Sequence, residues 1–133
     1  MSQIRAKIVE VKNVETLHIV TFDYKGTLLS MMSLDLNDKV SVGREVLLHI
    51  KPTHTVIAKS FSGEISYANH IKSKITSVEH GELLSSIVLE HQGDSFESII
   101  TKDSAQKMNL EEGLEVTVMV QASDLSIKEI VDV

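Results

Sequence analysis

The sequence lacks cysteine and tryptophan, and its 133 residues include one proline and only five aromatic side chains, three of Phe and two of Tyr. Without cysteine, neither a disulfide framework nor a thiolate metal site is possible. No apolar run approaches the roughly 18 residues of a membrane span, and the first residues lack the apolar segment of a signal peptide. We therefore expect a cytoplasmic protein that makes no contact with a membrane.

The scarcity of positive charge and of aromatic rings also bears on function. The net charge is -6, whereas a nucleic-acid-binding module needs a basic groove and rings on which bases stack, so nucleic acid is not an expected partner. The six histidines lack the paired helical spacing of a zinc site, so no metal ligands are predicted. No Gly-x-Ser-x-Gly, P-loop or dinucleotide motif is present, and we expect no enzyme activity.

The chain is long enough for one ordinary core or for two very small ones, with an apolar content of 42%. A unit of about 65 residues buries only about 60% of its unfolded surface. Two such units would therefore lean on each other or on a partner chain, and we expect a homo-oligomer.

A tandem repeat organises the chain. Four segments recur in the same order, the first two after 67 residues and the last two after 70 residues. The matching pairs are 7–11 with 74–78, 20–26 with 87–93, 42–46 with 112–116, and 56–57 with 126–127. Four matches in order with a single change of length indicate a duplication.

Each copy has the pattern of five short strands and one helical segment. The predicted strands are 4–11, a segment up to 24, 27–31, 46–50 and a short last strand in copy one, and 71–78, a segment up to 91, 95–101, 116–120 and a short last strand in copy two. Residues 102–109 are predicted to be helical, with a shorter counterpart at 34–39. The predicted fold class is all-β with one short helix per repeat, arranged as two tandem OB-like five-stranded β-barrel modules. Because 59–64 is the expected joint, the predicted modules are 1–60 and 65–133.

Three segments of copy two resemble the molbindin (TOBE-domain) family. Residues 66–73, Ser-Tyr-Ala-Asn-His-Ile-Lys-Ser, are similar to the family's opening Ser-Ala-Arg-Asn-Gln-Leu-Lys-Gly. Residues 108–116 are similar to its central Leu-Gly-Leu-x-x-Gly-x-Glu-Val, and residues 121–124, Gln-Ala-Ser-Asp, to its closing Lys-Ala-Ser-Asp. The resemblance covers all of copy two and, more faintly, copy one.

The resemblance implies binding of molybdate or tungstate between modules of a homo-oligomer, a dimer, trimer or hexamer, which stores, buffers or senses the anion. Such a dianion is held by hydrogen bonds from hydroxyls, backbone N–H groups and cations, with no protein ligand on its metal atom. No organic cofactor is implied. The alternative is an oligomerising or regulatory interaction module whose anion site has degenerated.

The family's site residues map only in part onto copy two. Ser66 matches the opening serine, but Ala68 stands in place of the arginine, which leaves the backbone N–H of Ala68 or Asn69 as a donor. Thr101 and Ser104 match hydroxyls at the start of the short helix. Helix N-capping is an alternative explanation of Thr101.

The cation of the family's site is present in only one copy. The lysine that follows the fourth strand in the family corresponds to Lys51 in copy one and to the neutral Gln121 in copy two, where Ser123 matches the neighbouring serine. Lys51 is equally well explained as a solvated surface lysine. A charged site should therefore depend on Lys51.

Copy one supplies fewer of the expected groups. It begins too late to contain the opening serine and arginine, and its hydroxyl is either Ser30 or Ser33. We therefore predict a divided site, which combines Lys51 and one of these two serines with Ser66. The alternative combines the two hydroxyls at the helix start with groups from a neighbouring chain.

Overall fold

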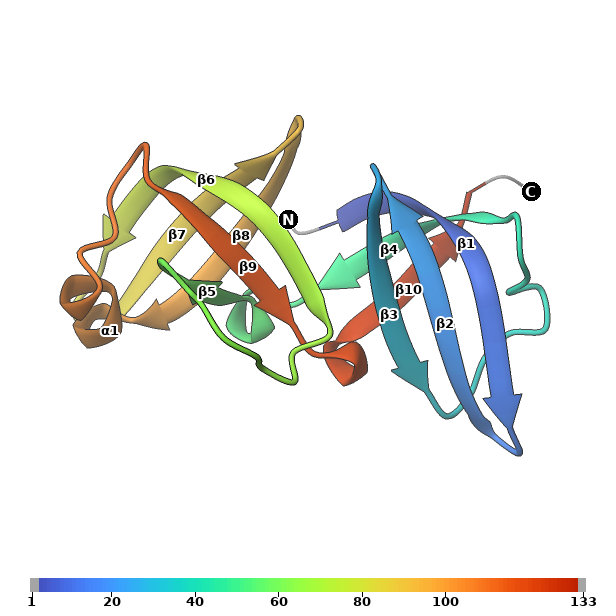
Figure 1. Ribbon diagram of the computed structural model, residues 1–133. Helices are drawn as coiled ribbons and strands as arrows, with labels where there is room; N and C mark the ends of the chain where they lie inside the picture. The colour runs from blue at the N-terminus through green and yellow to red at the C-terminus, as the bar shows by residue number, and fades with distance from the viewer. Residues whose placement is uncertain (1–2, 132–133) are drawn as a thin grey trace. The chain divides into compact units, whose positions relative to one another are not determined.

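The computed structural model describes residues 3–131, drawn in Figure 1. The bounds of its elements are β1 Gln3–Val14, β2 Leu17–Tyr24, β3 Thr27–Ser33, β4 Glu45–Ile50, η1 Pro52–His54, β5 Val56–Ala58, β6 Asn69–His80, β7 Leu84–His91, β8 Asp94–Thr101, α1 Lys102–Lys107, β9 Glu115–Val120, η2 Ala122–Asp124 and β10 Leu125–Ile130. The strands form two curled five-stranded sheets, which confirms the predicted fold class. In the described part of the chain, no helix has the length and apolar character needed to cross a bilayer.

The first sheet has the strand order β10-β4-β1-β2-β3 and belongs to a compact unit that we call the N barrel, residues 3–50, 66–69 and 120–131. β2 and β3 form a hairpin in which Tyr24 pairs with Thr27. Both residues of its turn have positive φ, 49° for Lys25 and 89° for Gly26, as a two-residue hairpin turn requires. β10 also packs near β3, so the two edges of the sheet approach each other.

The second sheet has the order β5-β9-β6-β7-β8 and belongs to the C barrel, residues 51–65 and 70–119. Its hairpin between β7 and β8 repeats the one in the N barrel, with His91 paired to Asp94 and positive φ at both turn residues, Gln92 and Gly93. α1 begins where β8 ends and packs against β7 and β8. The duplicated sequence therefore folds twice into the same arrangement of hairpins.

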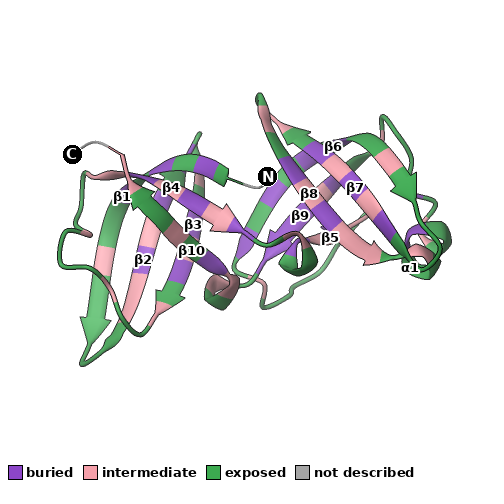
Figure 2. Cartoon of the chain, turned by 180° about the vertical axis from the view of Figure 1, so that it is seen from behind, coloured by how far each residue is buried: buried purple, intermediate pink, exposed green. Residues whose placement is uncertain are grey.

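Each barrel has its own core, built from alternate residues of its strands. In β4 the side chains of Val46, Leu48 and Ile50 are buried, as the period of two predicts. Val116, Val118 and Val120 of β9 repeat this pattern. Figure 2 shows the same alternation of buried and exposed residues along β1 and β6.

The last strand of each copy pairs with the sheet of the other copy. β10, from copy two, is antiparallel to β4 in the N barrel, and β5, from copy one, is antiparallel to β9 in the C barrel. The N barrel also includes residues 66–69. The limits 1–60 and 65–133 thus describe the repeated sequence, whereas the compact units exchange their closing strands.

Two local expectations were wrong. No helix forms at 34–39, where the chain makes turns instead, because this loop is three residues shorter than its counterpart and contains the turn formers Asp35, Asn37 and Asp38. The first strand, predicted to end at residue 11, continues to Val14 and pairs with Leu17, so the turn that follows lies at 15–16. The helix of copy two is confirmed at Lys102–Lys107.

Candidate functional site

Asn69 joins the opening segment of copy two to β3 of copy one. Its side chain accepts a hydrogen bond from the Ser30 backbone N–H (2.7 Å) and donates one to the Ser30 carbonyl (2.9 Å). β3 is an edge strand of the N barrel, so these two backbone groups lie on its side that lacks a neighbouring strand. Asn69 is 1% exposed, so burial and this two-point contact hold its side chain against β3.

The closing residues of the family resemblance lie against the same strand. η2 packs against β3 within the N barrel. Gln121 is the N-cap residue of η2, with φ of -71° and ψ of 151°, and its side chain makes no capping hydrogen bond. Gln121 and Ser123 are both exposed. The amide of Gln121 and the hydroxyl of Ser123 are therefore available beside β3.

Three further predicted residues belong to the N barrel. Ser66 and Ala68 are exposed in the segment that leads into Asn69. The Ser33 hydroxyl donates to the carbonyl oxygen of Asp35 (3.2 Å), so it stabilises its own loop. Ser30 thus bonds to the opening segment through its backbone, whereas the hydroxyl of Ser33 is committed to a local contact.

Lys51 occupies the equivalent of the Gln121 position in the C barrel. It is the N-cap residue of η1, with φ of -70° and ψ of 137°, and it is exposed. η1 packs against β8, just as η2 packs against β3. Thr53 is the counterpart of Ser123 at the offset of 70 residues, and it is also exposed. This hydroxyl was missed in the sequence, although the repeat itself would have identified it.

Thr101 and Ser104 form a helix cap at the end of β8. The Thr101 hydroxyl accepts a hydrogen bond from the Ser104 backbone N–H (3.1 Å) and donates to the Ser104 hydroxyl (2.9 Å). Thr101 is therefore the N-cap residue of α1, as the alternative explanation of this residue predicted. Both residues are exposed, and Thr101 lines a hollow of about 480 Å³ with Leu83, Leu84 and Lys102.

The hairpin registers identify the true counterpart of Thr101 in copy one. Thr101 follows its turn glycine, Gly93, by eight residues, and Leu34 follows Gly26 by the same number. β2 and β3 keep the same register as β7 and β8 on both sides of these turns. The position is therefore filled by an exposed leucine, and neither Ser30 nor Ser33 is equivalent to Thr101.

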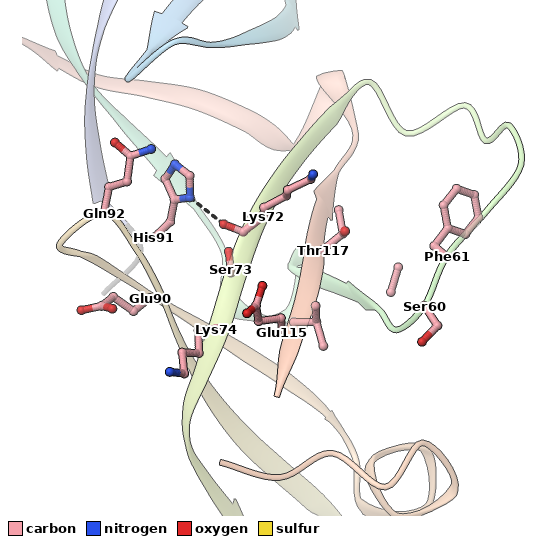
Figure 3. Close-up of a pocket in the computed structure, with 12 residues that line it drawn as sticks. Ser60, Phe61, Lys72, Ser73, Lys74, Glu90, His91, Gln92, Glu115 and Thr117 are labelled. Atoms are coloured by element: carbon pink, nitrogen blue, oxygen red, sulfur yellow. Dashed lines mark hydrogen bonds between the residues drawn. The ribbon is translucent and has the colours of Figure 1, made fainter. Parts of the chain in front are cut away.

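A polar hollow of about 430 Å³ on the outer face of the C barrel contains none of the predicted residues (Figure 3). It is lined by Lys72 and Lys74 of β6 together with Glu90 and Glu115. The ring of His91 donates from Nδ1 to the Lys72 carbonyl (2.5 Å). Because the lysines are balanced by the glutamates, this hollow lacks the positive excess that favours a dianion, and we do not place the anion there.

Metal coordination by side chains has no support in residues 3–131. Within this range, no three histidine or carboxylate side chains converge where they could hold a metal ion. The chemistry available to the candidate residues is hydrogen-bond donation from hydroxyls, amides and one ammonium group.

Comparison with known proteins identifies the family. The TOBE domain family model matches residues 65–127. Molybdenum-pterin-binding protein 3 of Clostridium pasteurianum is 36% identical over 64 residues, which cover 47% of this chain and 94% of that protein. The chain belongs to the molbindin (TOBE-domain) family. Molybdenum-pterin-binding protein 2 of the same organism is 34% identical over a region of the same length.

The molbindin fold extends over both copies. A solved structure of the cytoplasmic molybdate-binding protein ModG, with molybdate bound, has a TM-score of 0.88 to this chain and covers 95% of it and 94% of its own length. Its sequence is 19% identical, so the likeness concerns the fold. Copy one, in which the sequence resemblance was faint, thus has the same fold as copy two.

Proposed function

We propose that this molbindin-family protein binds molybdate or tungstate by hydrogen bonds and stores, buffers or senses the anion in the cytoplasm. The observation that carries the proposal is that segments 66–69 and 121–124 both contact the same strand, β3 of the N barrel. These are the two ends of the family resemblance, 52 residues apart in sequence (121 minus 69). The relatives named for molybdenum binding support the same ligand.

The proposed groups at this site are neutral donors. They are the hydroxyls of Ser66, Ser30 and Ser123, the amide of Gln121 and the backbone N–H of Ala68 or Asn69. A tetrahedral dianion with four acceptor oxygens matches such a set. In the C barrel, Lys51, Thr101 and Ser104 are the corresponding candidates. We further propose that neighbouring chains of a homo-oligomer complete the sites, as the resemblance to the molbindin family implies.

Calorimetric titration with molybdate, tungstate and sulfate tests this function. We expect heat of binding with molybdate or tungstate, and a ligand at 100 times its Kd should stabilise the fold by about 2.7 kcal/mol. Ser123→Ala should weaken binding, whereas Ser62→Ala, an exposed serine in the joint, should not. Absence of both heat and thermal stabilisation with all three anions would overturn the proposal.

The interaction-module alternative is favoured by one observation. Ala68 and Gln121 leave the N barrel cluster without the arginine and the lysine of the family pattern, and Asp124 adds a carboxylate to η2. If no anion binds while the protein still assembles, the oligomerising or regulatory role is the better account. The names of the relatives from Clostridium pasteurianum also include a pterin. A titration with a molybdenum–pterin complex, compared with the titration with molybdate, therefore shows which of the two ligands binds.

A further inference from the structure

We infer that Asn69 is a positioning residue for the oxyanion site: its side chain fixes the donor segment 66–69 against the free edge of β3. The inference rests on the proposed function, because the site it serves is the one proposed above. Its basis is the pair of hydrogen bonds between the Asn69 amide and the Ser30 backbone, at 2.7 and 2.9 Å. The amide has both the donor and the acceptor that an edge strand leaves unpaired.

The geometry makes Asn69 a substitute for a neighbouring strand. Ser30 pairs with Thr21 of β2, yet its N–H and C=O are directed at Asn69. A rigid two-point contact of this kind sets both the distance and the orientation of the segment that carries it. Ser66 and Ala68 lie three residues and one residue before Asn69, and both are exposed, whereas Asn69 is 1% exposed. The buried amide therefore anchors the exposed donors.

The C barrel offers a control, a buried hydrogen bond that holds none of the proposed donors. The Ser73 hydroxyl of β6 donates to the backbone carbonyl of Ile71 in the same strand (3.1 Å), and Ser73 is 6% exposed. Neither residue belongs to the proposed site, and the contact is local to β6. Ser73→Ala therefore removes a buried hydrogen bond without releasing a donor segment.

The test compares Asn69→Leu with Ser73→Ala and the unaltered chain. Asn69→Leu keeps the size of the side chain and removes both hydrogen bonds. We expect it to weaken molybdate binding about tenfold or more, the effect typical of residues that orient ligand-binding groups. It should also lower the ratio of molybdate to sulfate affinity, because a loosened segment discriminates anion size less well. Ser73→Ala should lower the thermal midpoint and leave both quantities unchanged.

The ratio of molybdate to sulfate affinity distinguishes a positioning role from a purely structural one, because a structural residue lowers the folded fraction without changing this ratio in the folded protein. All titrations are made at a temperature at which circular dichroism shows that the variants are folded. If Asn69→Leu does not fold, it is replaced by Asn69→Ser, which keeps a shorter donor and acceptor. Equal affinity and selectivity in the Asn69 variant and the unaltered chain overturn this inference alone. Failure of the unaltered chain to bind any of the anions overturns the proposed function and the inference with it.

Discussion

At the scale of single residues, charge and hydroxyl groups are distributed unequally between the two barrels. Among the predicted site residues, only Lys51 carries a positive charge, and it lies at the N-cap of η1 in the C barrel. Gln121 occupies the equivalent N-cap of η2 in the N barrel with nearly the same backbone conformation. The two positions therefore offer the same geometry with and without a cation.

Lys51→Met should lower molybdate affinity about threefold to fivefold at low salt. The estimate follows because an exposed ion pair contributes up to about 1 kcal/mol, and a tenfold change in affinity corresponds to about 1.4 kcal/mol. The effect should decrease at high ionic strength, where exposed charges are screened. Calorimetry at two salt concentrations measures both changes.

Lys39→Met is the control for this change, since Lys39 is an exposed lysine in the loop that follows β3. It should leave the affinity unaltered at both salt concentrations. Unchanged affinity in the Lys51 variant at low salt would show that Lys51 is a solvated surface lysine.

The sequence identified most of the candidate residues but not their contacts. Its spacing located Gln121 and Ser123, and the structure packs η2, which Gln121 precedes and which contains Ser123, against β3. It could not reveal that the Asn69 amide bonds to the backbone of Ser30, because the two residues are 39 positions apart and backbone groups carry no sequence signal. The Ser33 hydroxyl likewise turns to Asp35 for a local reason that composition does not show.

At the scale of elements, the strands were predictable and their partners were not. Alternation in residues 46–50 and 116–120 marks strands with one buried face, and the glycine turns fix the hairpins. Neither signal fixes the partners of the short closing strands, 56–58 and 125–130. Because these two strands are equivalent in the repeat, the sequence pattern is the same whether each pairs within its own copy or with the other copy. Only the path of the chain after η1 and η2 decides between them.

The exchange of closing strands predicts a reciprocal effect of two substitutions. Leu125 of β10 is 3% exposed and pairs with Ile50, so Leu125→Ala should destabilise the N barrel by about 2–5 kcal/mol. Hydrogen exchange of the β4 amides, encoded by copy one, should accelerate. Ile57→Ala in β5 should instead accelerate exchange in β9, encoded by copy two.

Hydrogen exchange read by mass spectrometry or NMR resolves β4 from β9. Each substitution serves as the control for the other, since both remove a buried side chain from a closing strand. Acceleration of β9 by Leu125→Ala and of β4 by Ile57→Ala would mean that each closing strand pairs within its own copy in solution.

At the scale of the whole molecule, both barrels leave apolar side chains exposed at the equivalent end of their sheets. In the N barrel these are Val14, at the tip of the first hairpin, and Leu34, just beyond β3, with exposed fractions of 75% and 66%. In the C barrel, Leu83 is 80% exposed beside the hollow that contains Thr101. Exposed apolar groups gathered in this way are typical of protein–protein interfaces. Small cores add a second reason to assemble.

We therefore expect a homo-oligomer whose assembly depends on these ends. Leu34→Glu combined with Leu83→Glu should shift the protein toward the monomer in sedimentation velocity, because burying a carboxylate against a neighbouring chain is unfavourable.

Leu28→Glu is the matched control, since Leu28 is 65% exposed at the opposite end of β3, next to the turn with Gly26. If neighbouring chains complete the anion sites, the double variant should lose molybdate affinity together with assembly. A double variant that remains assembled, or an unaltered chain that is monomeric with and without molybdate, would contradict the expectation. Loss of assembly with full affinity would instead show that each chain holds its anion alone.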